Sequence, residues 1–306
     1  MIDIRRILCP VDFSDCSRLA LDHAVAIAKW YASTVTLLHV SPPVPISAYA
    51  TVTSTRPSSP VDGDNQNEVL EAMKRFSAAV DGLGVPLELA SSEGDAAQEI
   101  VASAATADSD LIVMGTHGRS GFQRLVLGSV TEKVLRKAGS PVLSVPPRLA
   151  DAASTPQAVF RRLLCAVDFS DCSMRALDYA MSLAQESNSA LTVLNVIEPL
   201  PAAAIDRHEV AVADYTMKDY IAAVTEESSA RLAKAIPDHV REFCHVETVQ
   251  CVGTPYREIL RVAAEEASDV IVIGVHGRGV VDLFFFGSTA QHVVRQAACP
   301  VLTMRA

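Results

Sequence analysis

The sequence predicts an α/β protein made of two copies of one domain, each a parallel sheet with helices on both faces. Three observations support this. Short apolar runs typical of buried strands alternate with amphipathic segments of helical period. The string V-D-F-S-D-C-S occurs at both Val11–Ser17 and Val167–Ser173. A glycine-rich loop between a strand and a helix also occurs twice, with its spacing intact.

The internal repeat sets the domain organisation. R-R-I-L-C-P-V-D in the first half aligns with R-R-L-L-C-A-V-D in the second, and S-P-V-L-S-V aligns with C-P-V-L-T-M. Between the copies lies the proline- and alanine-rich stretch Pro146–Gln157. We therefore expect domains at residues 1–147 and 158–306, with a linker at 148–157. A length of 306 residues gives each copy enough chain to bury its own core.

Each element of the first copy follows from its local pattern. Ser14 and Asp95 are expected to cap helices, and β-branched residues favour a strand before Ser41. The expected strands are Ile4–Val11, Thr34–Val40, Pro86–Ala90, Leu111–Met114 and Val142–Val145; the expected helices are Ser14–Ala28, Glu68–Asp81, Asp95–Ala107 and Gly128–Lys137.

One connection in each copy stands out. Ser41–Asn67 is rich in proline, serine and threonine and is too long for a simple loop, so it is either a flap over a site or disordered. The second copy follows the same element order, but its corresponding segment Glu198–Asp219 carries more charge. The two copies are therefore expected to differ in what they bind.

Composition narrows the class of protein. The chain is 49% hydrophobic and has 26 basic and 36 acidic residues, for a net charge of -10, which argues against nucleic acid or an anionic membrane as the main partner. No signal sequence opens the chain and no apolar run approaches the roughly 18 residues of a membrane span, so we expect a cytoplasmic protein. The seven cysteines form no C-x-x-C pair, and a structural role is favoured over redox sensing.

The first glycine loop predicts a phosphate site. Gly115–Ser129 reads G-T-H-G-R-S-G-F-Q-R-L-V-L-G-S and follows a buried strand. Gly115 and Gly118 let backbone N–H groups approach a ligand, and Gly128 and Ser129 open a helix whose N-terminus favours an anion. The alternative is that these glycines only make tight turns and that Ser129 only caps the helix.

The second copy repeats the pattern. Gly274–Ser288 reads G-V-H-G-R-G-V-V-D-L-F-F-F-G-S, which keeps the glycines, the His-Gly-Arg core and the Gly-Ser ending. In an open parallel sheet, ligands bind beyond the carboxyl ends of the strands. Asp12 ends the first strand and Gly115 follows the fourth, so they face one pocket if those strands are neighbours. Asp12 would then accept hydrogen bonds from a ribose or base, unless it serves only as a turn or cap residue.

The pattern G-x2-G-x9-G-S, with V-D-F-S near the start of the domain and P-V-L near its end, resembles the nucleotide-binding branch of the universal stress protein family over both halves. The resemblance implies a five-stranded Rossmann-like sheet of order 3-2-1-4-5 that binds ATP or another adenine nucleotide, with Mg2+ as a possible companion. It also implies pairing through the last strand, so the halves would form an internal pseudo-dimer, with a homodimer of chains as a further possibility. The implied cofactor-binding residues are Val11, Asp12, Val40, Gly115, Gly118, Arg119, Ser120, Gly128 and Ser129 in the first copy, and Val167, Asp168, Val196, Gly274, Gly277, Gly287 and Ser288 in the second.

The loops also differ in charge. Where the first loop carries Ser120, Gln123 and Arg124, the second carries Gly279, Asp282 and Leu283. An added carboxylate and a lost guanidinium weaken attraction for a polyphosphate if these side chains face the pocket. This predicts that the first copy binds nucleotide at least as tightly as the second.

The loop histidines, His117 and His276, are favoured for structural or phosphate-contacting roles over metal binding or proton transfer. Arg119 and Arg278 are candidates for phosphate contacts, with solvent exposure as the alternative. We expect no dedicated metal site and identify no catalytic residue.

Three functions fit the sequence. The first is a nucleotide-binding stress or signalling protein in which occupancy sets conformation or partner choice, with slow or no hydrolysis; its protein partner is unknown. The second is an ATPase or nucleotidyl transferase, although no G-x-x-x-x-G-K-[ST], H-x-G-H or S-G-G-x-D motif is present. The third is an interaction module that binds no nucleotide. The fold alone does not choose among them.

Overall fold

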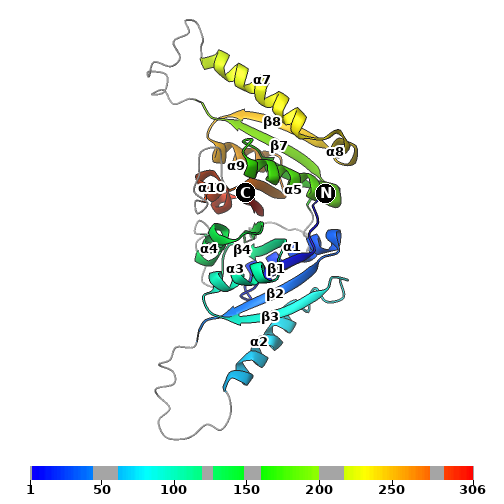
Figure 1. The fold of residues 1–306 in the computed structure, drawn as a ribbon, viewed down its shortest axis with the longest axis vertical. Coiled ribbons are helices and arrows are strands. Elements are labelled where there is room, and N and C mark those ends of the chain that lie inside the picture. Colours follow the sequence, from blue (N-terminus) through cyan, green and yellow to red (C-terminus); the bar gives the residue numbers. More distant parts are fainter. Residues whose placement is uncertain are drawn as a thin grey trace. The chain divides into compact units, whose positions relative to one another are not determined.

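The computed structural model describes residues 2–43, 61–118, 127–147, 160–199, 217–275 and 286–305. The chain forms two compact units, Asp3–Ala158 and Met1–Ile2 with Val159–Ala306 (Figure 1). Each unit is built around its own parallel sheet.

The first copy contains a five-stranded parallel sheet of order β3-β2-β1-β4-β5. Its elements are β1 (Arg6–Pro10), α1 (Asp15–Tyr31), β2 (Thr34–Ser41), α2 (Val61–Ser77), β3 (Leu87–Glu93), α3 (Ala96–Thr106), β4 (Leu111–Gly115), α4 (Ser129–Lys137) and β5 (Val142–Val145). The predicted fold class and strand order are confirmed for this copy.

The second copy has the matching order β8-β7-β6-β9-β10, again with every pair parallel. Its elements are β6 (Arg162–Ala166), α5 (Asp171–Ser187), β7 (Ala190–Ile197), α7 (Met217–Ala235), α8 (Asp238–Phe243), β8 (Val246–Val252), α9 (Pro255–Glu265), β9 (Val270–Gly274), α10 (Ser288–Gln296) and β10 (Val301–Met304). The fold class is confirmed here too. The short helix α8 has no counterpart among the predicted elements.

The sheet order places helices on both faces of each sheet. Parallel crossovers are right-handed, and the chain reverses its direction across the sheet after β3, so α1 and α2 cover one face and α3 and α4 the other. The contacts agree: Arg18 of α1 lies 3.7 Å from the ring centre of Phe76 of α2, while α3 packs against α4. The central strands are almost fully buried on both sides, as their unbroken apolar runs require.

Two predicted caps are confirmed. The Ser14 side chain accepts a hydrogen bond from the backbone N–H of Ser17, and Asp95 accepts one from Gln98. One predicted helix was misplaced. The helix expected at Glu68–Asp81 is α2 at Val61–Ser77, so the last residues of the expected connection Ser41–Asn67 are helical. The first turn contains the polar residues Asp62, Asp64 and Asn65. The apolar periodicity that predicts the rest of the helix therefore does not extend to its start. The remainder of that connection, 44–60, lies outside the described residues.

In the described part of the chain, no helix combines the length and the apolar character needed to cross a membrane.

Candidate functional site

The V-D-F-S turn positions a carboxylate at the end of the first strand of each copy. Asp12 Oδ1 accepts hydrogen bonds from the Ser14 backbone N–H at 3.1 Å and the Ser14 hydroxyl at 2.6 Å. Asp168 Oδ1 does the same with Ser170, at 3.0 and 2.6 Å. The turn role proposed for Asp12 is therefore real, and these bonds fix the carboxylate at the end of the strand.

This turn is strained in the same way in both copies. Phe13 and Phe169 have φ values of 64° and 63°, in the left-handed region that residues with a side chain rarely adopt. Strain of this kind is usually retained at functional sites. The ring of Phe13 stacks on His39, with ring centres 4.5 Å apart.

The glycine loop meets this turn. β1 pairs with β4, as the sequence argument required, and a Cβ on Gly118 would lie 2.8 Å from Asp12 Oδ2. A Cβ on Gly115 would lie 2.9 Å from the Cys16 sulfur in α1. Glycine at these two positions therefore allows the loop to pack closely against Asp12 and Cys16. This packing is a second explanation for the glycines, besides the predicted approach of the backbone to a ligand.

The sequence predicts phosphate contacts at the N-terminus of the helix that follows each loop. α4 begins at Ser129 after Gly128, and α10 begins at Ser288 after Gly287; neither glycine provides a side-chain cap. The N–H groups of such a first turn are available to an anion. The Gly128 N–H donates to the Thr116 carbonyl at 2.8 Å, and Gly287 donates equally to Val275, which fixes the direction of each helix.

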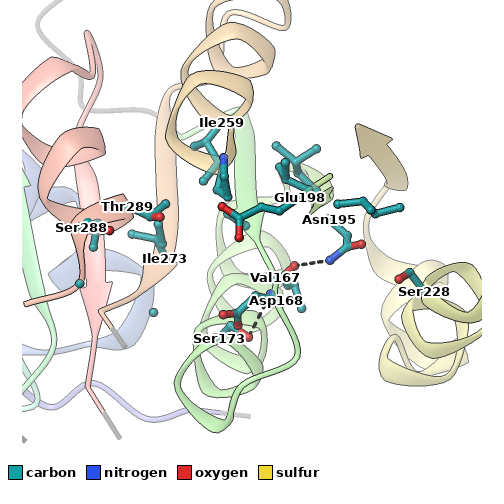
Figure 2. Close-up of a pocket in the computed structure, with 18 of the residues that line it drawn as sticks. Val167, Asp168, Ser173, Asn195, Glu198, Ser228, Ile259, Ile273, Ser288 and Thr289 are labelled. Carbon is teal, nitrogen blue, oxygen red and sulfur yellow. Dashed lines mark hydrogen bonds between the residues drawn. The ribbon is translucent and has the colours of Figure 1, made fainter. Parts of the chain in front are cut away.

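In the second copy these parts surround a cavity of about 500 Å³, shown in Figure 2. This volume lies in the usual range for small-ligand sites. Six of the predicted residues line it: Val167, Asp168, Val196, Gly274, Gly287 and Ser288. Its other walls include Asn195 and Glu198 from the end of β7, Val224 and Ser228 from α7, and Pro255 and Ile259 from α9. The cavity thus extends from α7 to the N-terminus of α10.

In the first copy the matching residues adopt the same backbone arrangement. The Val11 N–H donates to Leu38 O at 2.8 Å, as Val167 does to Leu194. Val40 pairs in register with Ser92 of β3, and Val196 with Cys251 of β8. Arg119, Ser120, Gly277 and the loop residues Gln123, Arg124, His276, Arg278, Gly279, Asp282 and Leu283 lie outside the described residues.

His117 is held at the mouth of the first loop. Its Nδ1 lies 2.8 Å from the Thr116 hydroxyl, and its buried Nε2 contacts no hydrogen-bond partner among the described residues. This geometry agrees with the structural or phosphate-contacting role. Over the described ranges, no group of three or more His, Cys, Asp or Glu side chains could jointly hold a metal ion.

The cysteines are free thiols, and the equivalent pair Cys9 and Cys165 is fully buried. Burial is the main cause that raises the pKa of each of these thiols far above its ordinary value. Burial also raises the pKa of Cys299 to about 12. Thiols held protonated in this way are poor nucleophiles, which supports the structural role predicted for these cysteines.

Sequence reasoning missed the residues at the α7 end of the cavity. Asn195 directly precedes Val196, but the sequence predicts no role for it. Ser228 lies on a helix whose pattern is weakly amphipathic. The alignment of L-L-H-V with V-L-N-V could have pointed to Asn195, because it places His39 and Asn195 at equivalent positions of the two copies.

The sequence model of the universal stress protein family matches residues 3–146 and 160–305. A universal stress protein of Methanocaldococcus jannaschii is 36% identical over 141 residues, 46% of this chain and 81% of that protein. One from Thermus aquaticus is 31% identical over 153 residues, 48% of this chain and all of that protein. A crystal structure of a universal stress protein from Archaeoglobus fulgidus has a TM-score of 0.63 and 24% identity, covering 99% of this chain and 97% of that one. This last likeness concerns the fold.

Proposed function

The chain belongs to the universal stress protein family, and from that premise we propose that it binds an adenine nucleotide, ATP or a close relative, at the carboxyl ends of its strands. The observation that carries the proposal is the cavity of about 500 Å³ in the second copy, which joins a strand-end carboxylate to an uncapped helix N-terminus. A nucleotide needs both features in one space.

The two ends of the cavity suit the two ends of a nucleotide. Phosphates would meet the first-turn N–H groups of α10 and the Ser288 hydroxyl, where the helix dipole favours negative charge. Asp168 would accept hydrogen bonds from ribose hydroxyls. The base would then lie toward Val196 and α7. A Mg2+ ion accompanying the triphosphate would take phosphate and water oxygens as ligands.

The first copy carries the same carboxylate turn and the same uncapped helix N-terminus. We propose that Val11, Asp12, Val40, Gly115, Gly118, Gly128 and Ser129 serve the equivalent ends of a second site, with Arg119 and Ser120 from the loop. Binding would set conformation or partner choice, and turnover would be slow or absent.

The experiment is calorimetric titration of the full chain with ATP, comparing Ser288→Asp with Ser288→Ala. An aspartate at the first position of a helix interacts favourably with the helix dipole, so this substitution does not destabilise the fold. It repels phosphate, and we expect at least a tenfold loss of affinity at the second-copy site, against a few-fold for alanine. Melting temperature serves as the control for folding.

Unchanged ATP affinity in Ser288→Asp would contradict the proposal. Absence of any adenine-nucleotide binding by the folded protein would favour an interaction module instead. A linear, protein-dependent release of phosphate that is lost in Ser129→Asp and Ser288→Asp would favour an enzyme.

A further inference from the structure

The second-copy cavity contains a buried acceptor that the fold itself does not use. Asn195 is only 4% exposed and lines the cavity. Its Nδ2 donates to the Val167 carbonyl at 2.8 Å. A carbonyl oxygen can only accept, so this bond fixes the orientation of the amide. The other amide atom, Oδ1, is buried and has no hydrogen-bond partner among the described residues.

An unpaired buried acceptor costs free energy, and proteins rarely keep one without use. Asn195 lies at the end of the cavity away from α10. In Figure 2 its nitrogen is directed at Val167 and its oxygen to the opposite side, where Ser228 of α7 lies. Ser228 and Val224, one helical turn apart, form the α7 wall of the same cavity. The acceptor therefore belongs to the end that would hold the base.

We propose that Asn195 selects the base in the second copy by accepting a hydrogen bond from the 6-amino group of adenine. The small side chain of Ser228 would leave space for the base. This rests on the proposed function. A 6-oxopurine presents an oxygen at the same place, so two acceptors would face each other and the base would be disfavoured. The Asn195 oxygen is buried, so this hydrogen bond requires the side chains that cover it to move when the base binds.

The first copy lacks this arrangement. His39 occupies the position of Asn195, and its Nδ1 lies 2.8 Å from the Val11 carbonyl, so it keeps the bond to the first strand. Its ring is stacked on Phe13 and presents no amide oxygen.

The helix above differs as well. Phe76 of α2 meets the Phe13 ring edge-on at 5.6 Å, and Arg231 of α7 lies 4.1 Å from the Phe169 ring centre. Three residues before Phe76 the first copy has Met73, 0% exposed, and three residues before Arg231 the second copy has Ser228. One turn before its ring contact, the first-copy helix therefore carries a long apolar side chain and the second-copy helix a small polar one.

These differences supply matched variants. Asn195→His retains a donor to the Val167 carbonyl, as His39 does toward Val11, and replaces the amide oxygen with the imidazole ring of the first copy. Ser228→Ala removes the hydroxyl and keeps the space beside it in the cavity. Ser228→Met introduces the side chain of Met73 from the first copy. All are made in the full chain carrying Ser129→Asp, so that nucleotide binding reports on the second copy. ATP and ITP, which differ at position 6 of the base, are titrated into each variant.

We expect Asn195→His to lower ATP affinity about tenfold and to change ITP affinity by less than about threefold, so that the preference for ATP falls. Ser228→Met should weaken both nucleotides, whereas Ser228→Ala should change the ratio little. A ratio of ATP to ITP affinity unchanged by Asn195→His, with ATP still bound, would overturn this inference alone. Failure of the parent to bind either nucleotide would overturn the proposed function together with it.

Discussion

The two copies agree closely at the strand-end carboxylate and differ at the helix that we propose faces the base. Both V-D-F-S turns make the same pair of hydrogen bonds, with a hydroxyl distance of 2.6 Å in each. Nearby, His39 of the first copy corresponds to Asn195 of the second; the helices carry Met73 and Phe76 in the first copy and Ser228 and Arg231 in the second. The comparison indicates that the turn and the helix N-terminus proposed for ribose and phosphate are the same in both copies, while side chains proposed to face the base differ.

The charges of the two loops and the residues proposed to face the base predict the tighter nucleotide binding in different copies. Arg124 and Asp282, both outside the described residues, predict that the first copy binds at least as tightly. The described residues favour the second copy, because the buried acceptor Asn195 Oδ1 lies there. We therefore expect the tighter adenine site in the second copy.

The largest effect is expected at the glycines before α4 and α10. A Cβ on Gly287 would lie 2.5 Å from the Val275 carbonyl oxygen, and one on Gly128 would lie 2.8 Å from that of Thr116. Because backbone must move, Gly287→Ala should lower the free energy of unfolding by about 3 kcal/mol and Gly128→Ala by about 2 kcal/mol. Urea unfolding measures both.

Gly139→Ala is the matched control, since nothing lies within 4 Å of the added Cβ. It should be neutral or slightly stabilising. Equal effects of all three substitutions would show that the contacts at Gly128 and Gly287 do not constrain the chain.

A smaller effect is expected where the helices cover the two phenylalanines. Phe76→Ala removes an aromatic pair with Phe13 and the contact with Arg18, so we expect a loss of about 2 kcal/mol. Arg231→Ala removes an exposed cation from above Phe169 and should cost less than about 1 kcal/mol. Thermal unfolding of the two variants compares these losses, and a larger loss for Arg231→Ala than for Phe76→Ala would contradict the predicted order.

The smallest effect concerns the caps of α3 and α9. Asp95 accepts a hydrogen bond from Gln98 N–H, whereas Thr254 makes no side-chain cap bond. Asp95→Ala should therefore lower the melting temperature measurably and Thr254→Ala hardly at all. A greater loss with Thr254→Ala would contradict this.

The cap of α3 should also depend on pH. The Gln98 N–H, and then Lys133, hold the pKa of Asp95 below its ordinary value. A lowered folded-state pKa gives stability that is present above the unfolded pKa of about 4 and is lost as pH falls through the folded value. The difference in melting temperature between wild type and Asp95→Ala should thus shrink below about pH 4.

Most of the fold could be predicted from the sequence because local signals and the repeat agree. Alternating apolar runs located the strands, and Ser14 and Asp95 marked helix starts. The start of α2 at Val61 was missed, since its first turn is polar and only packing of its later residues reveals the helix.

The site could be predicted only in part. Glycines and Asp12 are recognisable because their spacing in sequence is fixed by one turn. Asn195 and Ser228 are brought together by the fold, from a strand and from a helix 33 residues further on in numbering. Among the residues that the structure describes, the Asn195 oxygen has no hydrogen-bond partner, and this follows from packing that no local sequence pattern contains.

The central claim is that this chain holds an adenine nucleotide, with the second copy as its tighter site. The most direct measurement is to purify the chain without added nucleotide, denature it, and identify and count the released small molecule by mass spectrometry and absorbance, for wild type and for the Ser129→Asp and Ser288→Asp variants. We predict at least about one adenine nucleotide per wild-type chain, kept in Ser129→Asp and lost first in Ser288→Asp. Retention in Ser288→Asp with loss in Ser129→Asp would contradict the order of the two sites, and a wild-type chain that releases none and binds no added ATP would contradict the claim itself.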